Sequence, residues 1–205
     1  MSTNTTSVWR KKLKELEIVV VIPTYNNGKT LAAVIEEVCR YADDIIVVND
    51  GSTDDTANIL EQYPAIRTIT HPVNKGKGTA LKHGLSQAKK EGFRYAITID
   101  SDGQHFASDI PCFIEAIEKE PDTLLVGARN LASDNMPGKN TFANKFSNFW
   151  FRLETGLKLE DTQSGYRLYP LRKMDVQSCW YTAKYEFELE AIVFAAWGDV
   201  VVKNI

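Results

Sequence analysis

Short apolar runs alternate with amphipathic segments along the first 126 residues of the chain. Residues 18–22 are β-branched and end at Pro23, which is typical of a strand buried on both faces of a sheet. In residues 31–39 the apolar side chains recur every three or four positions, which predicts an amphipathic helix. Further strands are expected at 45–48, 66–70, 95–99 and 123–126, and further helices through 57–60, 80–88 and 110–117.

This alternation predicts an α/β fold in which a doubly wound, mostly parallel sheet is flanked by helices, because parallel neighbours need a crossover. The pattern changes after residue 126. Residues 130–139 are polar and rich in turn formers, so a loop is expected there. The following segment, from Phe142 to Leu153, carries an aromatic stripe that suits a core face, with a lipid- or partner-facing surface as the alternative. A loop at 160–165, a helix at 185–197 and a final strand at 200–203 are expected beyond it.

Length and composition fit one globular domain. The chain has 205 residues, 43% hydrophobic and 25% charged, which excludes disordered and coiled-coil classes. Its 24 basic and 27 acidic residues give a net charge of −3, which argues against a nucleic-acid binder. The three cysteines lack the spacing of a disulfide framework or a zinc site. Neither a signal peptide nor a membrane-spanning run is evident, so we expect a cytoplasmic protein with at most peripheral contact with a membrane.

Two acidic residues follow the strand expected at 95–99. The segment Asp100-Ser101-Asp102-Gly103-Gln104 begins where that strand ends, and ligands of open α/β sheets bind beyond the carboxyl ends of the strands. Carboxylate and amide oxygens are hard ligands that suit Mg²⁺ or Mn²⁺. Asp100, Asp102 and Gln104 are therefore the candidate metal ligands.

Three other strand ends carry polar residues of the same kind. Residues 23–27 follow the first strand, and Asp50 follows the second, where its carboxylate could accept a hydrogen bond from a uracil or guanine N–H. The glycine-rich segment 74–78 follows the third strand, and its Lys75 is a candidate for binding phosphate. No P-loop and no GxGxxG fingerprint is present, which removes the main support for an NTPase or a dinucleotide oxidoreductase.

These four motifs resemble those of family 2 glycosyltransferases, which have the GT-A fold. The quoted matches are residues 21–26, 49–56, 74–81 and 100–105; residues 127–129 and 161–167 resemble the branch of dolichyl- and polyprenyl-phosphate sugar transferases. The resemblance implies one domain, with a nucleotide-sugar half at about 17–104 and an acceptor half at about 105–205. It also implies a divalent ion, Mg²⁺ or Mn²⁺, on the diphosphate of a UDP- or GDP-linked sugar.

The resemblance distributes the candidate roles over the chain. Pro23, Tyr25 and Asp50 would surround the nucleotide, and Arg129, Arg167 and Ser164 would face the acceptor. Asn27 stands where members of that branch often carry Glu, and it would offer an amide to the base or ribose. The full set comprises Pro23, Thr24, Tyr25, Asn27, Asp50, Lys75, Ser101, Ser164 and Arg167 for substrate, Asp102, Asp161 and Arg129 for catalysis, and Asp100, Asp102 and Gln104 for the metal.

The reaction implied is an inverting sugar transfer, and two acceptors stay open. A lipid phosphate is already a nucleophile near neutral pH, whereas a saccharide hydroxyl needs a base, for which Asp161 or Glu160 is the candidate. A sugar-phosphate nucleotidyltransferase and a binding module without turnover are the alternatives. His71 and His83 have no visible partners in the sequence. The Glu186-Glu188-Glu190 alternation indicates a solvated helix face, or one member that reaches the acceptor cleft.

Overall fold

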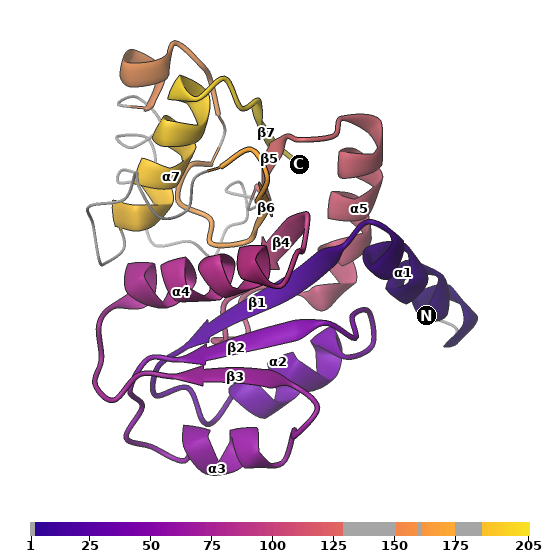
Figure 1. Ribbon diagram of the computed structural model, residues 1–205, viewed down its shortest axis with the longest axis vertical. Coiled ribbons are helices and arrows are strands. Elements are labelled where there is room, and N and C mark those ends of the chain that lie inside the picture. The colour runs from indigo at the N-terminus through magenta and orange to yellow at the C-terminus, as the bar shows by residue number, and fades with distance from the viewer. Residues whose placement is uncertain (1–2, 129–150, 160, 175–185) are drawn as a thin grey trace, which may run out of the picture.

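One mixed sheet organises the protein (Figure 1). The computed structural model describes residues 3–128, 151–159, 161–174 and 186–205. Seven strands pair in the spatial order β3-β2-β1-β4-β6-β5-β7. They are β1 (Ile18–Thr24), β2 (Ile45–Asn49), β3 (Arg67–Thr70), β4 (Tyr95–Thr98), β5 (Leu124–Val126), β6 (Arg167–Pro170) and β7 (Val202–Asn204). The helices are α1 (Thr3–Glu15), α2 (Leu31–Val38), α3 (Thr56–Glu61), α4 (Lys77–Lys90), α5 (Ile110–Lys119) and α7 (Glu186–Trp197), with a 3₁₀ turn, η1 (Ala107–Asp109).

The expected mostly parallel α/β architecture is confirmed, and the strands that follow residue 126 in the chain add an antiparallel element. Strands β3, β2, β1 and β4 run parallel to one another. Strand β6 is antiparallel to both β4 and β5, while β7 is parallel to β5. Strand β6 was not expected from the sequence, because it is short and its arginine and proline interrupt the apolar pattern.

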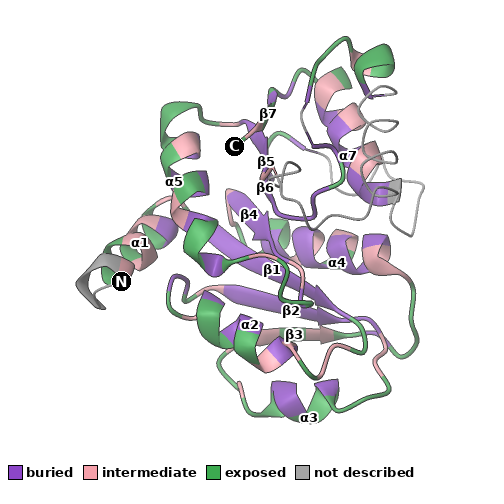
Figure 2. Cartoon of the chain, turned by 180° about the vertical axis from the view of Figure 1, so that it is seen from behind, coloured by how far each residue is buried: buried purple, intermediate pink, exposed green. Residues whose placement is uncertain are grey.

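Both faces of the sheet are covered, as the uninterrupted apolar run of β1 predicted (Figure 2). Ile18, Val20 and Ile22 pack in one core with α1, α2, α3 and α5. Val19 and Val21 point to the opposite face, where α4 and α7 cover the sheet. Successive side chains of a strand alternate between faces, so a strand inside such a sheet has no position for a polar residue until it ends.

Helix α4 packs unusually close to the sheet. A Cβ built on Gly84 would lie 2.5 Å from Cγ1 of Val21, so only glycine allows this approach. The contact fixes the height of α4 above β1 and β2. As a result, the first turn of α4 lies beside the carboxyl ends of those strands (Figure 1).

Two parts of the chain differ from the expected elements or lie outside the described residues. Residues 3–15 form α1, which the polar composition of the N-terminus did not predict; its Leu13 is buried. The expected loop 130–139 lies outside the described residues, as does most of the aromatic stripe, whose Leu153 is 62% exposed. Among the described residues, no helix combines the length and apolar character needed to cross a bilayer.

Candidate functional site

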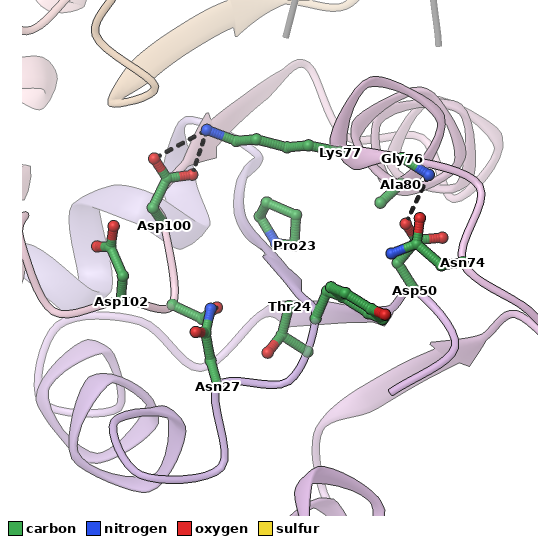
Figure 3. A pocket seen from close by; sticks show the side chains of 12 residues that line it. Pro23, Thr24, Asn27, Asp50, Asn74, Gly76, Lys77, Ala80, Asp100 and Asp102 are labelled. Carbon is green, nitrogen blue, oxygen red and sulfur yellow. Dashed lines mark hydrogen bonds and ion pairs between the residues drawn. The ribbon is translucent and has the colours of Figure 1, made fainter. Parts of the chain in front are cut away.

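A cleft of about 580 Å³ opens beyond the carboxyl ends of β1, β2 and β4 (Figure 3). The position follows from the topology, because polar residues first appear where each buried strand ends. Asp50 directly follows β2, and Asp100 lies two residues beyond the end of β4. The lining residues are Pro23, Thr24, Tyr25, Asn27, Asp50, Asn74, Gly76, Lys77, Ala80, Asp100, Ser101 and Asp102. The structure thus brings eight of the predicted site residues together.

Asp100 is held by a lysine from the first turn of α4. The Lys77 ammonium lies 2.8 Å from Asp100 Oδ1 and 2.9 Å from Oδ2, and it reaches Glu188 Oε1 of α7 at 3.0 Å. Burial alone would raise the pKa of Asp100, but neighbouring His105 and Lys77 outweigh it and lower that pKa to about 2. Burial alone would also lower the pKa of Lys77, but the two carboxylates hold it above its ordinary value. Both groups are therefore charged at neutral pH.

Gly165 makes this cluster sterically possible. A Cβ on Gly165 would lie 2.6 Å from Asp100 Oδ2, 2.8 Å from Glu188 Oε1 and 2.9 Å from Lys77 Nζ. Its carbonyl accepts a hydrogen bond from Thr98 Oγ1 of β4, at 2.7 Å. This hydrogen bond holds the loop that precedes β6 against the end of β4. Gly165, which has no side chain, faces the three charged groups.

Asp102 is the second acid of the cleft, and it is exposed. Its Oδ1 accepts the backbone N–H of Gln104 at 2.9 Å, which closes a tight turn. Gln104 itself is exposed and does not line the cleft, so its expected place beside Asp100 and Asp102 is not seen. No group of three or more His, Cys, Asp or Glu side chains with metal-binding geometry occurs among the described residues.

Asp50 is buried at the other end of the cleft and is heavily hydrogen-bonded. Its Oδ1 lies 2.6 Å from His71 Nδ1 and accepts the N–H of Lys75 at 2.9 Å; its Oδ2 accepts the N–H of Gly76 at 2.8 Å. His71 Nε2 continues the chain to His83 Nδ1 of α4, at 2.7 Å. Since a carboxylate only accepts, His71 Nδ1 carries the proton. The two histidines thus have partners that the sequence did not reveal.

The loop at 74–76 serves Asp50 as well as the cleft. Because the N–H groups of Lys75 and Gly76 point at Asp50, these two backbone donors are not available to a phosphate, contrary to the expectation for this segment. The Lys75 side chain is exposed and does not line the cleft. Lys77, two residues later, is the lysine that does.

The end of β1 contributes a hydroxyl and an amide. Thr24 is buried, and its Oγ1 has no hydrogen-bond partner among the described residues. Asn27 donates from Nδ2 to Ser101 Oγ at 2.8 Å, which ties the end of β1 to the acidic turn. Tyr25 is 45% exposed at the rim. An unsatisfied buried hydroxyl costs free energy, and Thr24 Oγ1 is such a group among the described residues.

Two residues expected to face the acceptor are buried and do not line the cleft. Arg167 is fully buried, and its guanidinium donates to the backbone carbonyls of Ser164 at 2.7 Å, Thr162 at 2.9 Å and Glu188. Ser164 Oγ accepts the N–H of Tyr166, at 3.3 Å. The expectation that Arg167 and Ser164 face the acceptor is therefore corrected: Arg167 holds the loop 162–166 against α7, and Ser164 closes a turn within that loop.

Asp161 also differs from its expected role. Its side chain is fully buried and its Oδ1 accepts the backbone N–H of Gln163 at 2.9 Å, so it closes a turn and does not line the cleft. A buried carboxylate in this position is not placed to take a proton from an acceptor hydroxyl. Arg129 and Glu160, the other candidates named for the acceptor side, lie outside the described residues.

Known proteins resemble the chain over most of its length. The model of the family described as glycosyl transferase family 2 matches residues 19–176. A UDP-N-acetylglucosamine–dolichyl-phosphate N-acetylglucosaminyltransferase from Methanococcus voltae is 31% identical, over 92% of this chain and 85% of that protein. The polyprenol monophosphomannose synthase of Mycolicibacterium smegmatis is 27% identical, over 78% and 64%.

A solved structure shares the fold. Glucosyl-3-phosphoglycerate synthase from Mycobacterium tuberculosis, in complex with Mn²⁺, UDP-glucose and phosphoglyceric acid, superposes with a TM-score of 0.73. The match covers 97% of this chain and 72% of the other, at 21% identity. At that identity the likeness concerns the architecture alone.

Proposed function

This chain belongs to glycosyl transferase family 2, and we propose that it moves a sugar from a nucleoside diphosphate to the phosphate of a polyprenyl lipid, with inversion at the anomeric carbon. Sugar transfer from a nucleotide sugar is the activity of the family. The observation that carries the proposal is the cleft itself, where the ends of β1, β2 and β4 bring together a buried carboxylate, an orphaned hydroxyl and two acids. We assign residues 17–104 to the donor half and 105–205 to the acceptor half.

The donor half offers distinct partners to the base and to the diphosphate. Asp50 accepts three hydrogen bonds from the protein, and a carboxylate has room for about four, so one acceptor position remains for a base N–H. Thr24 Oγ1 and the Asn27 amide are candidates for the nucleoside. The Lys77 ammonium is the positive charge on the cleft wall that suits a diphosphate oxygen.

The acids of the cleft fit a divalent cation. Asp100 and Asp102 both line the cleft, and their hard oxygens are the ligands that Mg²⁺ and Mn²⁺ prefer. A divalent cation held there would offset the negative charge that develops on the leaving diphosphate. The ion pair with Lys77 favours the charged form of Asp100, which is the form that binds a cation.

A phosphate acceptor, which needs no general base, fits the described part of the loop before β6. Asp161, the described candidate for a general base, is buried and does not line the cleft. A lipid phosphate needs no such base, because it is already ionised near neutral pH. The relatives named for dolichyl-phosphate and polyprenol substrates point to the same acceptor class. The protein would then work at the cytoplasmic surface of a membrane, where polyprenyl phosphate is held.

A donor and acceptor panel tests the proposal. The protein is incubated with Mn²⁺ or Mg²⁺ and with UDP- and GDP-linked sugars, with and without polyprenyl phosphate, and nucleoside diphosphate release is measured. Release that requires polyprenyl phosphate supports the proposal. Equal release with a saccharide acceptor in its place would redirect it to a hydroxyl acceptor. Donor binding without release would point to a module that has lost turnover.

Asp102→Asn gives a matched test of the cation assignment. The substitution keeps the size of the side chain and removes its charge, so metal-dependent donor binding should fall at least about tenfold. Donor binding is measured by calorimetry in Mn²⁺ and again in EDTA. An affinity in Mn²⁺ equal to that of the unsubstituted protein would remove Asp102 from the cation site.

A further inference from the structure

Three elements that are distant in sequence meet at Lys77. The lysine begins α4, Asp100 follows β4, and Glu188 lies in the first turn of α7 (Figure 3 shows Lys77 and Asp100). The ammonium contacts both oxygens of Asp100, and the side chains of Lys77 and Asp100 are only 22% and 21% exposed. Glu188 is more deeply buried, with 6% of its surface exposed. This arrangement is unlike a solvated surface pair, in which a lysine samples many positions.

The packing around the cluster is specific. Gly165 is the position where any Cβ would collide with all three charged groups, at 2.6 to 2.9 Å. The adjoining Arg167 holds the same loop by three backbone carbonyls, one of them on Glu188. The loop, α7 and the end of β4 are therefore built so that one ammonium lies between two carboxylates.

That ammonium lies where a cation bound by Asp100 would have to be. Lys77 lines the cleft together with Asp100 and Asp102, and it uses both oxygens of the Asp100 carboxylate. A divalent cation on Asp100 would meet a positive charge at close range, which is unfavourable unless the ammonium moves. The four-carbon stem of lysine allows that movement, and Glu188 stays within reach, but the ammonium then loses one of its two carboxylate partners.

We propose that Lys77 is the built-in counter-cation of Asp100 in the donor-free protein and makes divalent-cation binding depend on a nucleoside diphosphate. The diphosphate replaces the carboxylate that Lys77 gives up on leaving Asp100, while Glu188 remains its second partner, so cation and nucleotide enter together. The proposal rests on the function proposed above, since it assumes that the cleft takes a nucleoside diphosphate. Lys77 thereby couples the binding of the two ligands, and each ligand strengthens the binding of the other by the same free energy.

Binding of Mn²⁺ alone tests this directly. The full chain is stripped with EDTA, and free Mn²⁺ is measured by electron paramagnetic resonance during titration, with and without saturating UDP. For Lys77→Met, Mn²⁺ should bind about ten- to a hundredfold more tightly without UDP, because removing one like charge at close range shifts a neighbouring equilibrium by one to two powers of ten. The factor by which UDP strengthens Mn²⁺ binding should shrink correspondingly.

Two variants serve as controls. Lys75→Met removes the same charge two residues away, from a side chain that is exposed and outside the cleft lining, and should leave Mn²⁺ binding without UDP unchanged. Lys77→Arg keeps the charge and should retain the dependence on UDP. If Lys77→Met does not fold, as judged by circular dichroism, Lys77→Gln replaces it, since the amide can still donate to Asp100 without carrying charge.

The outcomes separate this inference from the proposed function. Mn²⁺ affinity without UDP that is unchanged or weaker in a folded Lys77→Met or Lys77→Gln variant overturns the inference, even if the protein transfers sugar. Tighter Mn²⁺ binding with a lost UDP effect upholds it, even if no lipid acceptor is found. If Lys75→Met tightens Mn²⁺ binding as much as Lys77→Met, the effect is one of overall charge and the inference fails.

Discussion

The buried chain from Asp50 through His71 to His83 gives the sharpest test of how the nucleotide end of the cleft is held. His71→Ala removes a ring that is buried beside the Asp50 carboxylate, with Nδ1 2.6 Å from Oδ1. Asp50 keeps the N–H groups of Lys75 and Gly76 but loses its one side-chain donor. The carboxylate is then buried with less compensation, and β3 loses its contact with α4 through His83.

The cost follows from two contributions. A hydrogen bond to a charged group contributes about 1.5–3 kcal/mol to stability. Loss of the buried ring adds about 1–2 kcal/mol from apolar surface and packing. The free energy of unfolding should therefore fall by about 2.5–5 kcal/mol, which is a large share of the roughly 5–15 kcal/mol that stabilises a domain.

Urea unfolding followed by tryptophan fluorescence measures this change, and His83→Ala is the matched control. His83 forms the exposed end of the same chain, so its removal should cost less than about 1 kcal/mol. Nucleotide affinity should fall for His71→Ala as well, because the Asp50 carboxylate loses its fixed orientation. If the two substitutions lower the free energy of unfolding by amounts that agree within about 0.5 kcal/mol, Asp50 does not depend on His71.

Three further outcomes are expected. Thr24→Val replaces a buried hydroxyl that has no partner among the described residues with a methyl group, so stability should hold or rise while nucleotide affinity falls about three- to tenfold. Urea unfolding measures the stability and calorimetry measures the affinity; an unchanged affinity would place Thr24 outside the ligand contacts. Gly165→Ala should cost about 1–2 kcal/mol in urea and open the Lys77–Asp100 contact, whereas an unperturbed crystal structure of the variant would contradict the steric argument. The pKa of Asp100 is lowered from 3.8 to about 2, so its ionised form stabilises the folded state above about pH 4, and this contribution is lost as the pH falls toward 2. In acid unfolding with EDTA, Asp100→Asn should show a smaller slope of unfolding free energy against pH, and a slope identical to that of the unsubstituted protein would refute the assignment.

The donor half was predictable from sequence because its signals are local. Uninterrupted apolar runs identify β1, β2 and β4, and a polar residue directly after such a run must lie at the carboxyl edge of the sheet. That rule located Asp50 and Asp100 without knowledge of any distance. The helix at residues 3–15 and strand β6 escaped the same reasoning, because α1 is stabilised by a few contacts such as Leu13 and β6 pairs with strands distant in sequence.

The roles of side chains after residue 160 depend on packing that no local pattern records. The motif 161–167 carried part of the family resemblance, but its polar groups satisfy backbone carbonyls and N–H groups of the same loop. An arginine that binds an anion and one that holds a loop have the same sequence signature. Only the burial of Arg167 distinguishes them.

Glu188 bears on the two alternatives that the sequence left open for the three glutamates of α7. Three glutamates at alternate positions suggested a solvated face, but alternate positions of a helix point in different directions, since each residue turns the helix by about 100°. Residues three, four and seven positions beyond Glu188 are Ala191, Ile192 and Ala195, and all three are buried. Glu188 therefore lies on the apolar stripe of α7, and a carboxylate in that place requires a cation nearby. Lys77, on the helix that covers the same face of the sheet, is that cation; the helical period indicates that Glu188 is buried, and the packing of α7 against α4 supplies its partner.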